Sequence, residues 1–350
     1  GLLDKPLPAV PTLGNGSAGE IVPLSHLFGP LTEKLTLAEK ERLALVNGSP
    51  CASALIADAV LAAKRRLDLA LEIFALAADA LKAPLEQFDS ALDELWCDPH
   101  EAAVLQKMRY WLKDADQDRR SYQAPVSWRI VPRVAAQAHR TVAQAEGVAS
   151  SSLRSVSDNP VFLPPNESRS LGRVLSNGGF HNAKAYPALD NLSACWADLA
   201  LLCDRQITKL LDDNISLLPH QLMQGDGYVG CMGFGAADYA ERARGCAQRT
   251  LLPGSEGGGF GQNDVAVPTF SASLKQAEAG RCLEACLAML AAISSQAFFI
   301  TERKAPPRLA ALLEEIRDSF SPVTEARALG PDTERLAGKF TARVFAPSLA

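Results

Sequence analysis

The sequence predicts a mainly α-helical protein, built as a bundle of long helices whose central members are buried in an oligomer. Apolar residues recur at helical spacing over several long stretches, whereas sustained alternation of apolar and polar residues is hard to find anywhere. Hydrophobic residues make up 47% of the chain and charged residues 21%, which is typical of globular rather than disordered proteins. The 350 residues are enough for a substantial core, and we expect one domain over residues 1–350.

The first long helix is predicted over residues 52–82, which contain neither glycine nor proline. Its apolar positions follow helical spacing: Leu55, Ile56, Val60, Ala63, Leu67, Leu71, Phe74, Ala78 and Leu81. Similar patterns predict helices over residues 131–152, 182–212, 233–250 and 269–304. All of these are longer than the average helix of a globular protein.

Two of these segments, 182–212 and 269–304, are apolar on nearly all faces, which predicts burial at the centre of an assembly. Most of the others carry a wide apolar stripe rich in alanine. Helices of this kind pack side by side in elongated bundles, and their outer faces often pair with other subunits. We therefore expect an oligomer.

Charge and cysteine usage exclude several classes of protein. The net charge of −5 argues against a nucleic-acid partner or an anionic membrane surface. With no uninterrupted apolar run of about 18 residues and no signal-peptide pattern, we expect a cytoplasmic protein. The eight cysteines are scattered and form no C-x-x-C pair, so we expect them reduced. Cys282 and Cys286 lie one helical turn apart without a nearby histidine, and no metal site is expected.

Residues 14–19 read GNGSAG, which matches the G-x-G-x-x-G pattern of a dinucleotide-binding turn. That pattern has physical meaning only between a strand and the start of a helix. The three prolines within residues 2–13 argue against a strand, and Pro23 is expected to break a following helix. The glycine loop therefore needs another explanation.

Three glycine-rich loops lie between the predicted helices, over residues 14–19, 176–181 and 253–264. Glycine allows the backbone to approach a ligand closely or to adopt an unusual conformation. Taken singly, each loop is explained as well by turn chemistry. Together, with amide or aromatic side chains among them, they point to a shared site.

With these segments in order, the chain resembles the aromatic amino acid lyase family, which includes histidine and phenylalanine ammonia-lyases and related aminomutases. The resemblance runs from the first residues to about Arg303. The matching segments are VPTLGNGSAGEIVPLSH, LALVNGSP, DQDRRSYQAPVSW, SDNP, SNGGFH, the pair Asp190-Asn191, and GQNDV. The resemblance implies the ammonia-lyase (fumarase/aspartase-like) helical fold and a homotetramer whose active sites are shared between subunits.

The family's chemistry relies on a methylidene-imidazolone, an electrophile formed when an Ala-Ser-Gly tripeptide cyclises and its serine loses water. Aligned without gaps, the tripeptide here is Ser17-Ala18-Gly19, followed by Glu20 in place of the family's aspartate. Alanine stands at the serine position and has no hydroxyl to lose. A shift of one residue would make Ser17 central, but Gly19 and Glu20 support the unshifted alignment. We predict that the prosthetic group does not form and expect no cofactor.

Other positions depart from the family in the same direction. Arg120 replaces a tyrosine, and Gln123 replaces the arginine that would bind a substrate carboxylate. A neutral amide lacks the bidentate, charge-assisted pair of an arginine, which weakens carboxylate binding by about 2 kcal/mol unless Arg120 compensates. Asn263 replaces a glutamate or glutamine and cannot act as a general base.

Three positions of the family's site are retained: Asn47, Gln117 and Phe180. By resemblance, the asparagine and glutamine lie beside the electrophile, and the phenylalanine packs in the substrate pocket. Each also has a structural explanation, since an Asn before Gly makes a turn, a Gln caps or faces solvent, and a Phe fills a core. Tyr122 and His181 complete the candidate polar groups, although a histidine beside a helix start is more often a cap than a base.

Three hypotheses about function remain open. The chain is an enzyme that acts on a small aromatic or amine-bearing substrate without the imidazolone, or an inactive pseudoenzyme that serves as an assembly subunit. The third is an ordinary ammonia-lyase whose serine was replaced, against which the changes at Arg120, Gln123 and Asn263 speak. The family's proton-accepting tyrosine lies on an N-terminal loop, and we expect this chain to lack that segment.

Overall fold

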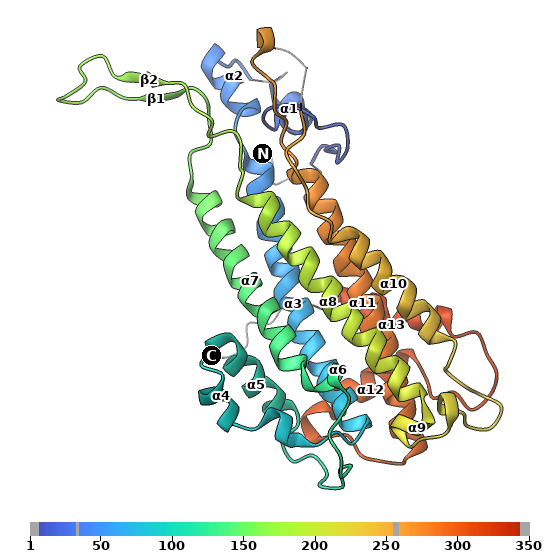
Figure 1. The fold of residues 1–350 in the computed structure, drawn as a ribbon. Coiled ribbons are helices and arrows are strands. Elements are labelled where there is room, and N and C mark those ends of the chain that lie inside the picture. The colour runs from blue at the N-terminus through green and yellow to red at the C-terminus, as the bar shows by residue number, and fades with distance from the viewer. Residues whose placement is uncertain (1–6, 33–34, 255–258, 344–350) are drawn as a thin grey trace. The chain divides into compact units, whose positions relative to one another are not determined.

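The structure is a computed structural model that describes residues 7–32, 35–254 and 259–343. Within these residues the chain is mainly helical, with one short two-stranded hairpin (Figure 1). The predicted mainly α-helical fold is therefore confirmed, whereas the burial of its central helices in an oligomer stays a prediction. The helices are α1 (Ile21–Thr32), α2 (Glu39–Val46), α3 (Pro50–Ala80), α4 (Ala91–Leu95), α5 (Pro99–Trp111), α6 (Val126–Arg129), α7 (Val131–Arg154), α8 (Ala185–Leu211), α9 (Asp213–Ser216), α10 (Met232–Cys246), α11 (Thr269–Ile300), α12 (Ala310–Ser319) and α13 (Gly330–Ala342).

Two compact units make up the chain. Unit 1 combines Gly1–Val60, Gln144–Asp190 and Arg249–Gln276, and unit 2 combines Leu61–Ala143, Asn191–Gln248 and Ala277–Ala350. Four of the five boundaries between them fall within α3, α7, α8 and α11, and the fifth follows the end of α10. The expectation of a single domain stays a prediction.

All five predicted long helices are present, and their ends have local causes. Helix α10 ends at Cys246 rather than at residue 250, and the Thr250 amide donates to the Asp190 carboxylate at 2.6 Å instead of continuing the helix. Helix α11 ends at Ile300, two residues before Glu302, whose φ of 50° is left-handed. A backbone in that region cannot continue a right-handed helix.

The hairpin was not predicted. Strands β1 (Val161–Leu163) and β2 (Arg173–Leu175) pair antiparallel in unit 1, with Phe162 opposite Val174. Each strand has three residues. This length is too short to display the alternation by which a strand is recognised in a sequence.

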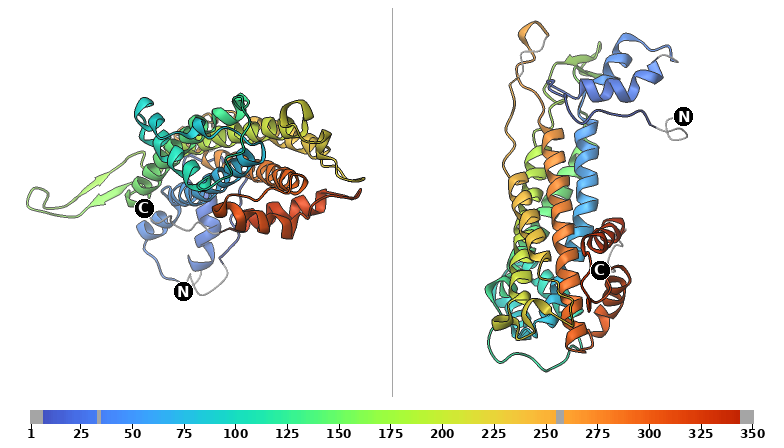
Figure 2. Two further views of the ribbon diagram at one scale, coloured as in Figure 1. Left: turned by 90° about the horizontal axis from the view of Figure 1, so that it is seen from below. Right: turned by 90° about the vertical axis from the view of Figure 1, so that its right-hand side faces the viewer.

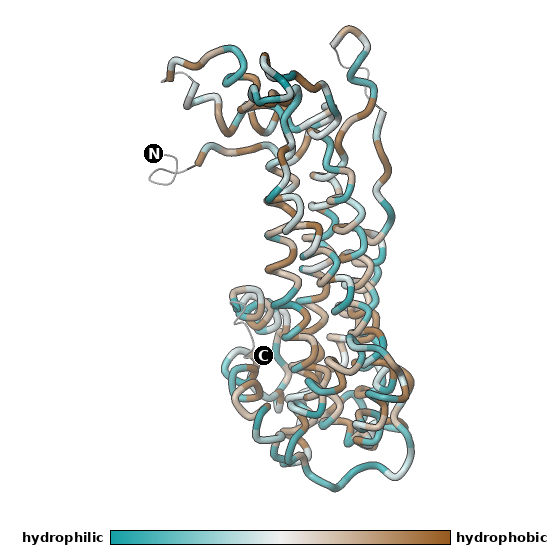
Figure 3. Tube along the Cα trace, turned by 90° about the vertical axis from the view of Figure 1, so that its left-hand side faces the viewer, coloured by the Kyte–Doolittle hydropathy of each residue, from teal (hydrophilic) through white to brown (hydrophobic). Residues whose placement is uncertain are grey.

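Unit 2 has a core in which the middle of α11 is buried on every side. All residues from 286 to 298 are buried, as the all-round apolar pattern predicts. Helix α8 differs, because within unit 2 one of its faces is exposed, at Asn191, Ala194, Asp198, Leu201, Arg205 and Thr208. Figure 3 shows apolar and polar residues interleaved along the long helices. Helices α12 and α13 pack against one another in the same unit (Figure 2).

Two described segments, Glu39–Ala80 and Thr269–Ile300, are long and apolar enough to span a membrane by length and composition. In the second, 83% of the most apolar window is buried inside the protein. The core helix of a folded bundle passes the same test. None of the eight cysteines, all of which lie within the described residues, forms a disulfide.

A buried ion pair joins α3 to α11 in unit 2. The Glu284 carboxylate accepts from Arg66 at 2.9 Å and from Arg65 at 2.6 Å, and its other oxygen accepts from the Thr341 hydroxyl at 2.8 Å. The guanidinium of Arg66 lies over Gly280, where an added Cβ would be 2.2 Å from its central carbon. Glycine at this position of α11 leaves room for the guanidinium of Arg66 where it lies in this structure.

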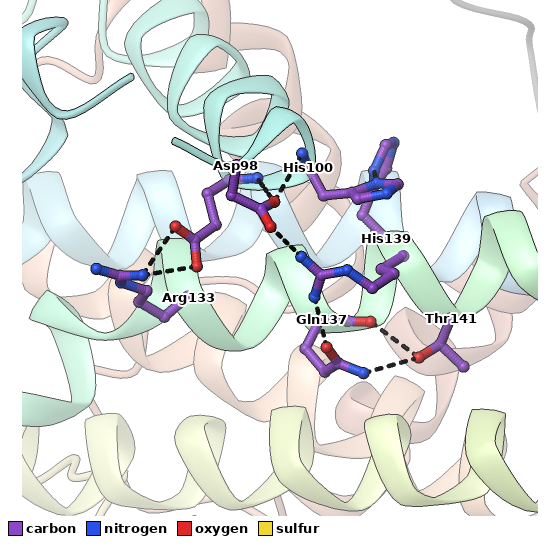
Figure 4. Close-up of polar contacts among 8 residues, drawn as sticks. Asp98, His100, Arg133, Gln137, His139 and Thr141 are labelled. Atoms are coloured by element: carbon purple, nitrogen blue, oxygen red, sulfur yellow. Dashed lines mark hydrogen bonds and ion pairs between the residues drawn. The ribbon is translucent and has the colours of Figure 1, made fainter. Parts of the chain in front are cut away.

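A second polar network joins α5 to α7 in unit 2 (Figure 4). Asp98 caps α5 by accepting from the amides of His100 at 2.9 Å and Glu101 at 3.1 Å. Its carboxylate also pairs with Arg140 of α7. The Nδ1 atoms of His100 and His139 lie 2.8 Å apart, which is a hydrogen bond between the two rings.

Candidate functional site

The tripeptide loop of unit 1 is held by backbone and side-chain hydrogen bonds. The Ser17 amide donates to the Asn15 carbonyl at 2.9 Å, and the Ser17 hydroxyl donates to the Gly19 carbonyl. The Ser17 carbonyl accepts from the Val267 amide at 2.9 Å. The loop therefore lies against the segment that leads into α11, and Ala18 presents only a methyl group.

The structure brings the first two glycine-rich loops together. A Cβ added at Gly19 would lie 3.5 Å from the Cβ and ring of Phe180, which is ordinary van der Waals contact. Phe180 is half-buried, and Gly19 is buried. Two residues that the sequence assigns to one site are therefore neighbours in unit 1.

The flanks of the glycine loop match the dinucleotide-binding context only in part. No strand forms over the described residues 7–20, as predicted. A helix does follow, however, since α1 begins at Ile21, and the expectation that Pro23 prevents it is wrong. Pro23 lies in the first turn, where a backbone N–H has no partner within the helix and its loss is tolerated.

Glu20 anchors the loop to the start of α3. It is 2% exposed, and its two carboxylate oxygens accept from the amides of Cys51 at 2.6 Å and Ala52 at 2.7 Å. Burial raises the pKa of Glu20 to about 7, although both amides act against the shift. Burial, together with the nearby Glu20 charge, raises the pKa of the Cys51 thiol to about 12, so this cysteine is a thiol at neutral pH.

Asn47 lies in a turn whose amide groups are engaged within unit 1. Its Nδ2 donates to the carbonyl of Asn159, and its Oδ1 accepts from the Gly48 amide at 3.1 Å. Gly48 has a φ of 118°, and a Cβ there would lie 2.9 Å from the hydroxyl oxygen of Ser157. These bonds favour the structural explanation for the Asn-Gly pair, and they also tie it to the SDNP segment.

His181 and Asn263 complete the predicted residues of unit 1. His181 is half-buried, and its Nε2 is buried without a partner among the described residues. Asn263 is half-buried at the end of the third glycine-rich loop, of which residues 255–258 lie outside the described residues.

The other four predicted residues belong to unit 2. Gln117 is exposed and donates to the Ala115 carbonyl at 3.0 Å. Arg120 donates to the Ile215 carbonyl at 2.6 Å, its Nη1 is buried without a partner among the described residues, and burial lowers its pKa. Gln123 is exposed and donates to the hydroxyl of Tyr122 at 3.4 Å. Tyr122 itself is 74% exposed.

A polar group that sequence reasoning missed lies beside the first loop in unit 1. Asp190 accepts from the amide of Thr250 at 2.6 Å and from its hydroxyl at 2.8 Å, and Lys275 donates to the same hydroxyl at 2.8 Å. Lys275 also lies 3.5 Å from the Asp190 carboxylate. These hydrogen bonds join segments that are far apart in the sequence. The Asp190-Asn191 pair was the only sequence feature that pointed to them.

A cavity of about 380 Å³ opens beside this group. It is lined by Gly14, Asn15 and Gly16 of the tripeptide loop and by Thr250. The start of α11 and the residues before it complete the wall, with Val267, Pro268, Phe270, Ser271, Leu274 and Lys275. Asn15 donates to the Pro11 carbonyl at 2.8 Å, and its buried Oδ1 has no partner among the described residues. The cavity thus offers an acceptor from Asn15 and a cation from Lys275. No group of three or more potential metal ligands occurs among the described residues.

Comparison with known proteins identifies the class to which this fold and these loops belong. The sequence profile described as aromatic amino acid lyase matches residues 32–318, and the chain belongs to this family. The match begins after the Ser17-Ala18-Gly19 loop.

Several relatives are histidine ammonia-lyases. The chain is 28% identical over 377 residues to the one from Burkholderia multivorans (strain ATCC 17616 / 249), covering 97% of this chain and 72% of the relative. It is 30% identical over 274 residues to that of Burkholderia mallei (strain NCTC 10229), covering 70% of this chain and 53% of the relative.

Solved structures share the fold. The histidine ammonia-lyase of Trypanosoma cruzi superimposes with a TM-score of 0.84 at 21% identity, covering 95% of this chain and 68% of that one. Ergothionase from Treponema denticola gives 0.85 at 16% identity, covering 95% and 72%. Tyrosine aminomutase from Streptomyces globisporus gives 0.83 at 21% identity, covering 97% and 73%.

Proposed function

We propose that this protein is an ammonia-lyase-like enzyme that acts on a small aromatic or amine-bearing substrate by acid–base chemistry, without a methylidene-imidazolone. The observation that carries the proposal is Ala18, whose methyl side chain stands where the family needs a hydroxyl that can leave. The relatives named for histidine, tyrosine and ergothioneine support the substrate class.

The residues present do not fit the prosthetic group. Ala18 has no oxygen to eliminate, and the hydroxyl of Ser17 donates to the Gly19 carbonyl within the same loop. Gly19 is retained, but a glycine alone cannot supply an exocyclic alkene. The chemistry at this site must therefore come from side chains that bind a substrate or move a proton.

Glu20 and the Asp190–Lys275 pair are the titratable groups that support such a role in unit 1. A carboxyl with a pKa near 7 is able to exchange a proton at neutral pH. Lys275 provides a cation beside the cavity. A substrate carboxylate would pair with it, although Gln123 stands where the family has an arginine.

The assembly proposed with this function is a homotetramer in the cytoplasm, with active sites shared between subunits and a small molecule as the ligand. The exposed face of α8 in unit 2 supports this assembly. It carries Leu201, an apolar residue that is 39% exposed among polar neighbours such as Asp198 and Arg205. No nucleic-acid or membrane partner is proposed.

A pseudoenzyme that acts as an assembly subunit is the second candidate. It is favoured by the engagement of two predicted site groups in structural bonds, Arg120 with the Ile215 carbonyl and Asn47 with the Asn159 carbonyl. An ordinary ammonia-lyase with a replaced serine is the third candidate, and the changes at Gln123 and Asn263 oppose it.

Intact-mass measurement of the purified chain tests the claim about the prosthetic group. We expect the mass of the unmodified sequence, whereas a mass lower by two molecules of water would contradict it. Ser17→Ala is the matched control, because it removes the only hydroxyl in the tripeptide. Water loss in the wild type that disappears in Ser17→Ala would show that the ring forms with the register shifted by one residue.

A panel of small molecules separates the first two candidates. Histidine, phenylalanine, tyrosine and their decarboxylated amines are each tested for binding and turnover. The enzyme hypothesis expects at least one compound to bind and be converted, but not to an α,β-unsaturated acid. Lys275→Met is expected to weaken binding of the amino acids more than that of the amines, because only the former carry a carboxylate. A panel in which nothing binds favours the pseudoenzyme.

A further inference from the structure

A second cavity lies in unit 2, between the end of α11 and helix α12. Its volume is about 580 Å³, and apolar side chains such as Phe298 and Leu313 form part of its wall. Three cationic residues line it as well, Arg303, Lys304 and Arg317. Nothing in the proposed function uses this cavity.

Both of these arginines have a buried hydrogen-bond donor without a partner among the described residues. The Nε atom of Arg303 and the Nε atom of Arg317 are both buried without a hydrogen-bond partner among the described residues. A buried donor left unpaired destabilises the folded protein, and more strongly when the group is charged. Such groups in a native structure point to an unseen water, ion or ligand.

The other hydrogen bonds of the two arginines leave these Nε donors unpaired. Arg303 directs Nη2 toward the Asp79 carboxylate at 3.3 Å and Nη1 toward the Asp118 carbonyl at 3.1 Å, which leaves Nε. Arg317 makes no ion pair or side-chain hydrogen bond that the described residues provide. Both arginines therefore have donors for a ligand that carries acceptor oxygens.

The charged side chains around the cavity favour an anionic ligand. Glu302 and Glu314 also line it, and both are exposed to solvent, where water screens their charges. The side chain of Arg303 is only 7% exposed, and the Asp79 carboxylate 3.3 Å from its Nη2 partly neutralises its charge. Arg317 has no ion pair among the described residues, so it gives the wall a cation with which an anionic ligand can pair.

We propose that this cavity binds a small organic anion, a carboxylate or a phosphate ester with an apolar body. The oxygens accept hydrogen bonds from the Nε atoms of Arg303 and Arg317, and Lys304 adds charge at the rim. The apolar body packs against Phe298 and Leu313. Guanidinium groups suit both oxyanions, since their planar donors match carboxylate and phosphate geometry.

Arg303 also connects the cavity to the loop that carries Gln117 and Arg120. Asp79 is fully buried and pairs with Arg303 and, at 2.6 Å, with Arg119 of that loop. The Asp118 carbonyl in the same loop accepts from Arg303. An anion that engages Arg303 therefore stiffens this loop. Its importance for substrate binding rests on the proposed function, whereas anion binding itself does not.

Titration calorimetry on the full chain tests the site with four probes: phenyl phosphate, phenylacetate, inorganic phosphate and phenethylamine. We expect phenyl phosphate or phenylacetate to bind more tightly than inorganic phosphate, and phenethylamine not to bind. The preferred anion tells a phosphoryl ligand from a carboxylate. Equal binding of inorganic and phenyl phosphate would overturn the assignment of an organic ligand, and binding of none of the anions would overturn the site.

The matched variants are Arg317→Met and Arg308→Met. Arg317→Met is expected to weaken binding at least about tenfold, the usual effect of losing a hydrogen bond to a charged group. Arg308 does not line the cavity, because its guanidinium lies 3.8 Å from the centre of the Tyr110 ring, so its variant should bind like the wild type. Equal weakening in both variants would mean a general effect of charge and would contradict the proposal.

Lys304→Met provides a second variant should Arg317→Met unfold, since Lys304 is exposed and outside the core. It is expected to weaken binding by a few-fold. If Arg317→Met and Lys304→Met both bind the anion like the wild type, or if the one that folds does, the proposed site is wrong. Hydrogen exchange of the peptide around Asp118 should slow when the anion binds, and unchanged exchange would refute the connection through Arg303.

Discussion

Glu20 combines two opposing effects on one carboxyl group. Its burial disfavours the charge, while the first amides of α3 and the helix dipole favour it. Burial is the larger effect, so the pKa rises to about 7. A side chain that anchors the tripeptide loop is therefore sensitive to pH in the physiological range.

The stability contributed by Glu20 should fall as the pH rises. Below its ordinary pKa of 4.5 the carboxyl is protonated in both the folded and the unfolded chain. Between 4.5 and about 7 only the folded chain holds the proton, so each rise in pH favours unfolding. The total loss is on the order of 3 kcal/mol, at about 1.4 kcal/mol per tenfold change in proton affinity.

Glu20→Gln removes this titration and provides the comparison. Urea unfolding of both proteins on either side of the window should show the wild type losing stability relative to the variant as the pH rises. A difference between the two proteins that does not change with pH would contradict the raised pKa.

Gly280 is a residue at which a single added methyl group should be harmful. In Gly280→Ala the new Cβ would meet the guanidinium of Arg66 and displace it from Glu284. Glu284 would keep Arg65 as a partner, so the cost should lie below the about 3–5 kcal/mol of leaving a buried charge unpaired. We expect a measurable fall in the thermal midpoint.

Gly338→Ala is the matched control for this prediction. Gly338 lies within α13, and no heavy atom lies within 4 Å of an added Cβ. Alanine is a better helix former than glycine by up to about 1 kcal/mol, so this variant should be as stable as the wild type or more so. Similar destabilisation in both variants would argue against the role of Arg66.

At the scale of the element, the junction of α5 and α7 contains the pair His100–His139 (Figure 4). One Nδ1 must donate and the other accept, so the pair cannot hold a proton on both of these atoms. Burial, with the charges of His100 and Lys107, lowers the pKa of His139, and only Asp68 acts against the shift. Asp98, Glu101, Arg133 and Arg140 are the other charged groups at this junction.

The lowered pKa predicts a loss of stability in acid. Below the ordinary pKa of 6.5 the unfolded chain takes up a proton on His139 that the folded chain does not accept. The loss therefore begins near 6.5 and is complete below the lowered folded pKa. His139→Gln should lose less stability than the wild type when thermal melts at neutral pH and in mild acid are compared.

His220→Gln is the control for this element. The His220 side chain is 64% exposed and lies 3.4 Å from Asp213, away from the junction. Its variant should follow the wild type at both pH values. A His139→Gln protein that also follows the wild type would show that the histidine pair is not responsible for acid sensitivity.

At the scale of the whole molecule, the exposed face of α8 is the feature that a tetramer would explain. It includes Asp198, whose pKa is raised because the side chain is already partly buried. Leu201 lies on the same face, while the opposite side of α8 includes the fully buried Trp196 and Leu199. A subunit contact over this face would bury Leu201, which lies there among mostly polar side chains.

Leu201→Lys tests this proposal by placing a charge within the face. We expect the molecular mass measured by light scattering after size exclusion to fall from that of a tetramer to that of a smaller species. Leu95→Lys is the control, because Leu95 is 73% exposed at the end of α4, and its variant should keep the wild-type mass. A tetramer that persists in Leu201→Lys would place the interface elsewhere.

The helices could be predicted from the sequence because their periodicity is local. Residues 52–82 and 269–304 carry a repeat that the chain displays without reference to any partner, and α3 and α11 follow it closely. The absence of a hydroxyl at Ala18 is likewise a property of one residue, and no fold alters it.

The partners of the site residues were decided by tertiary structure. Nothing near Arg120 in sequence indicates that it donates to the Ile215 carbonyl, and nothing near Thr250 indicates Asp190 and Lys275. Such pairs depend on how segments far apart in the chain meet, which is set by packing and not by spacing. The residue types at the candidate site are therefore written in the sequence, whereas their hydrogen bonds, burial and pKa values arise only when the chain folds.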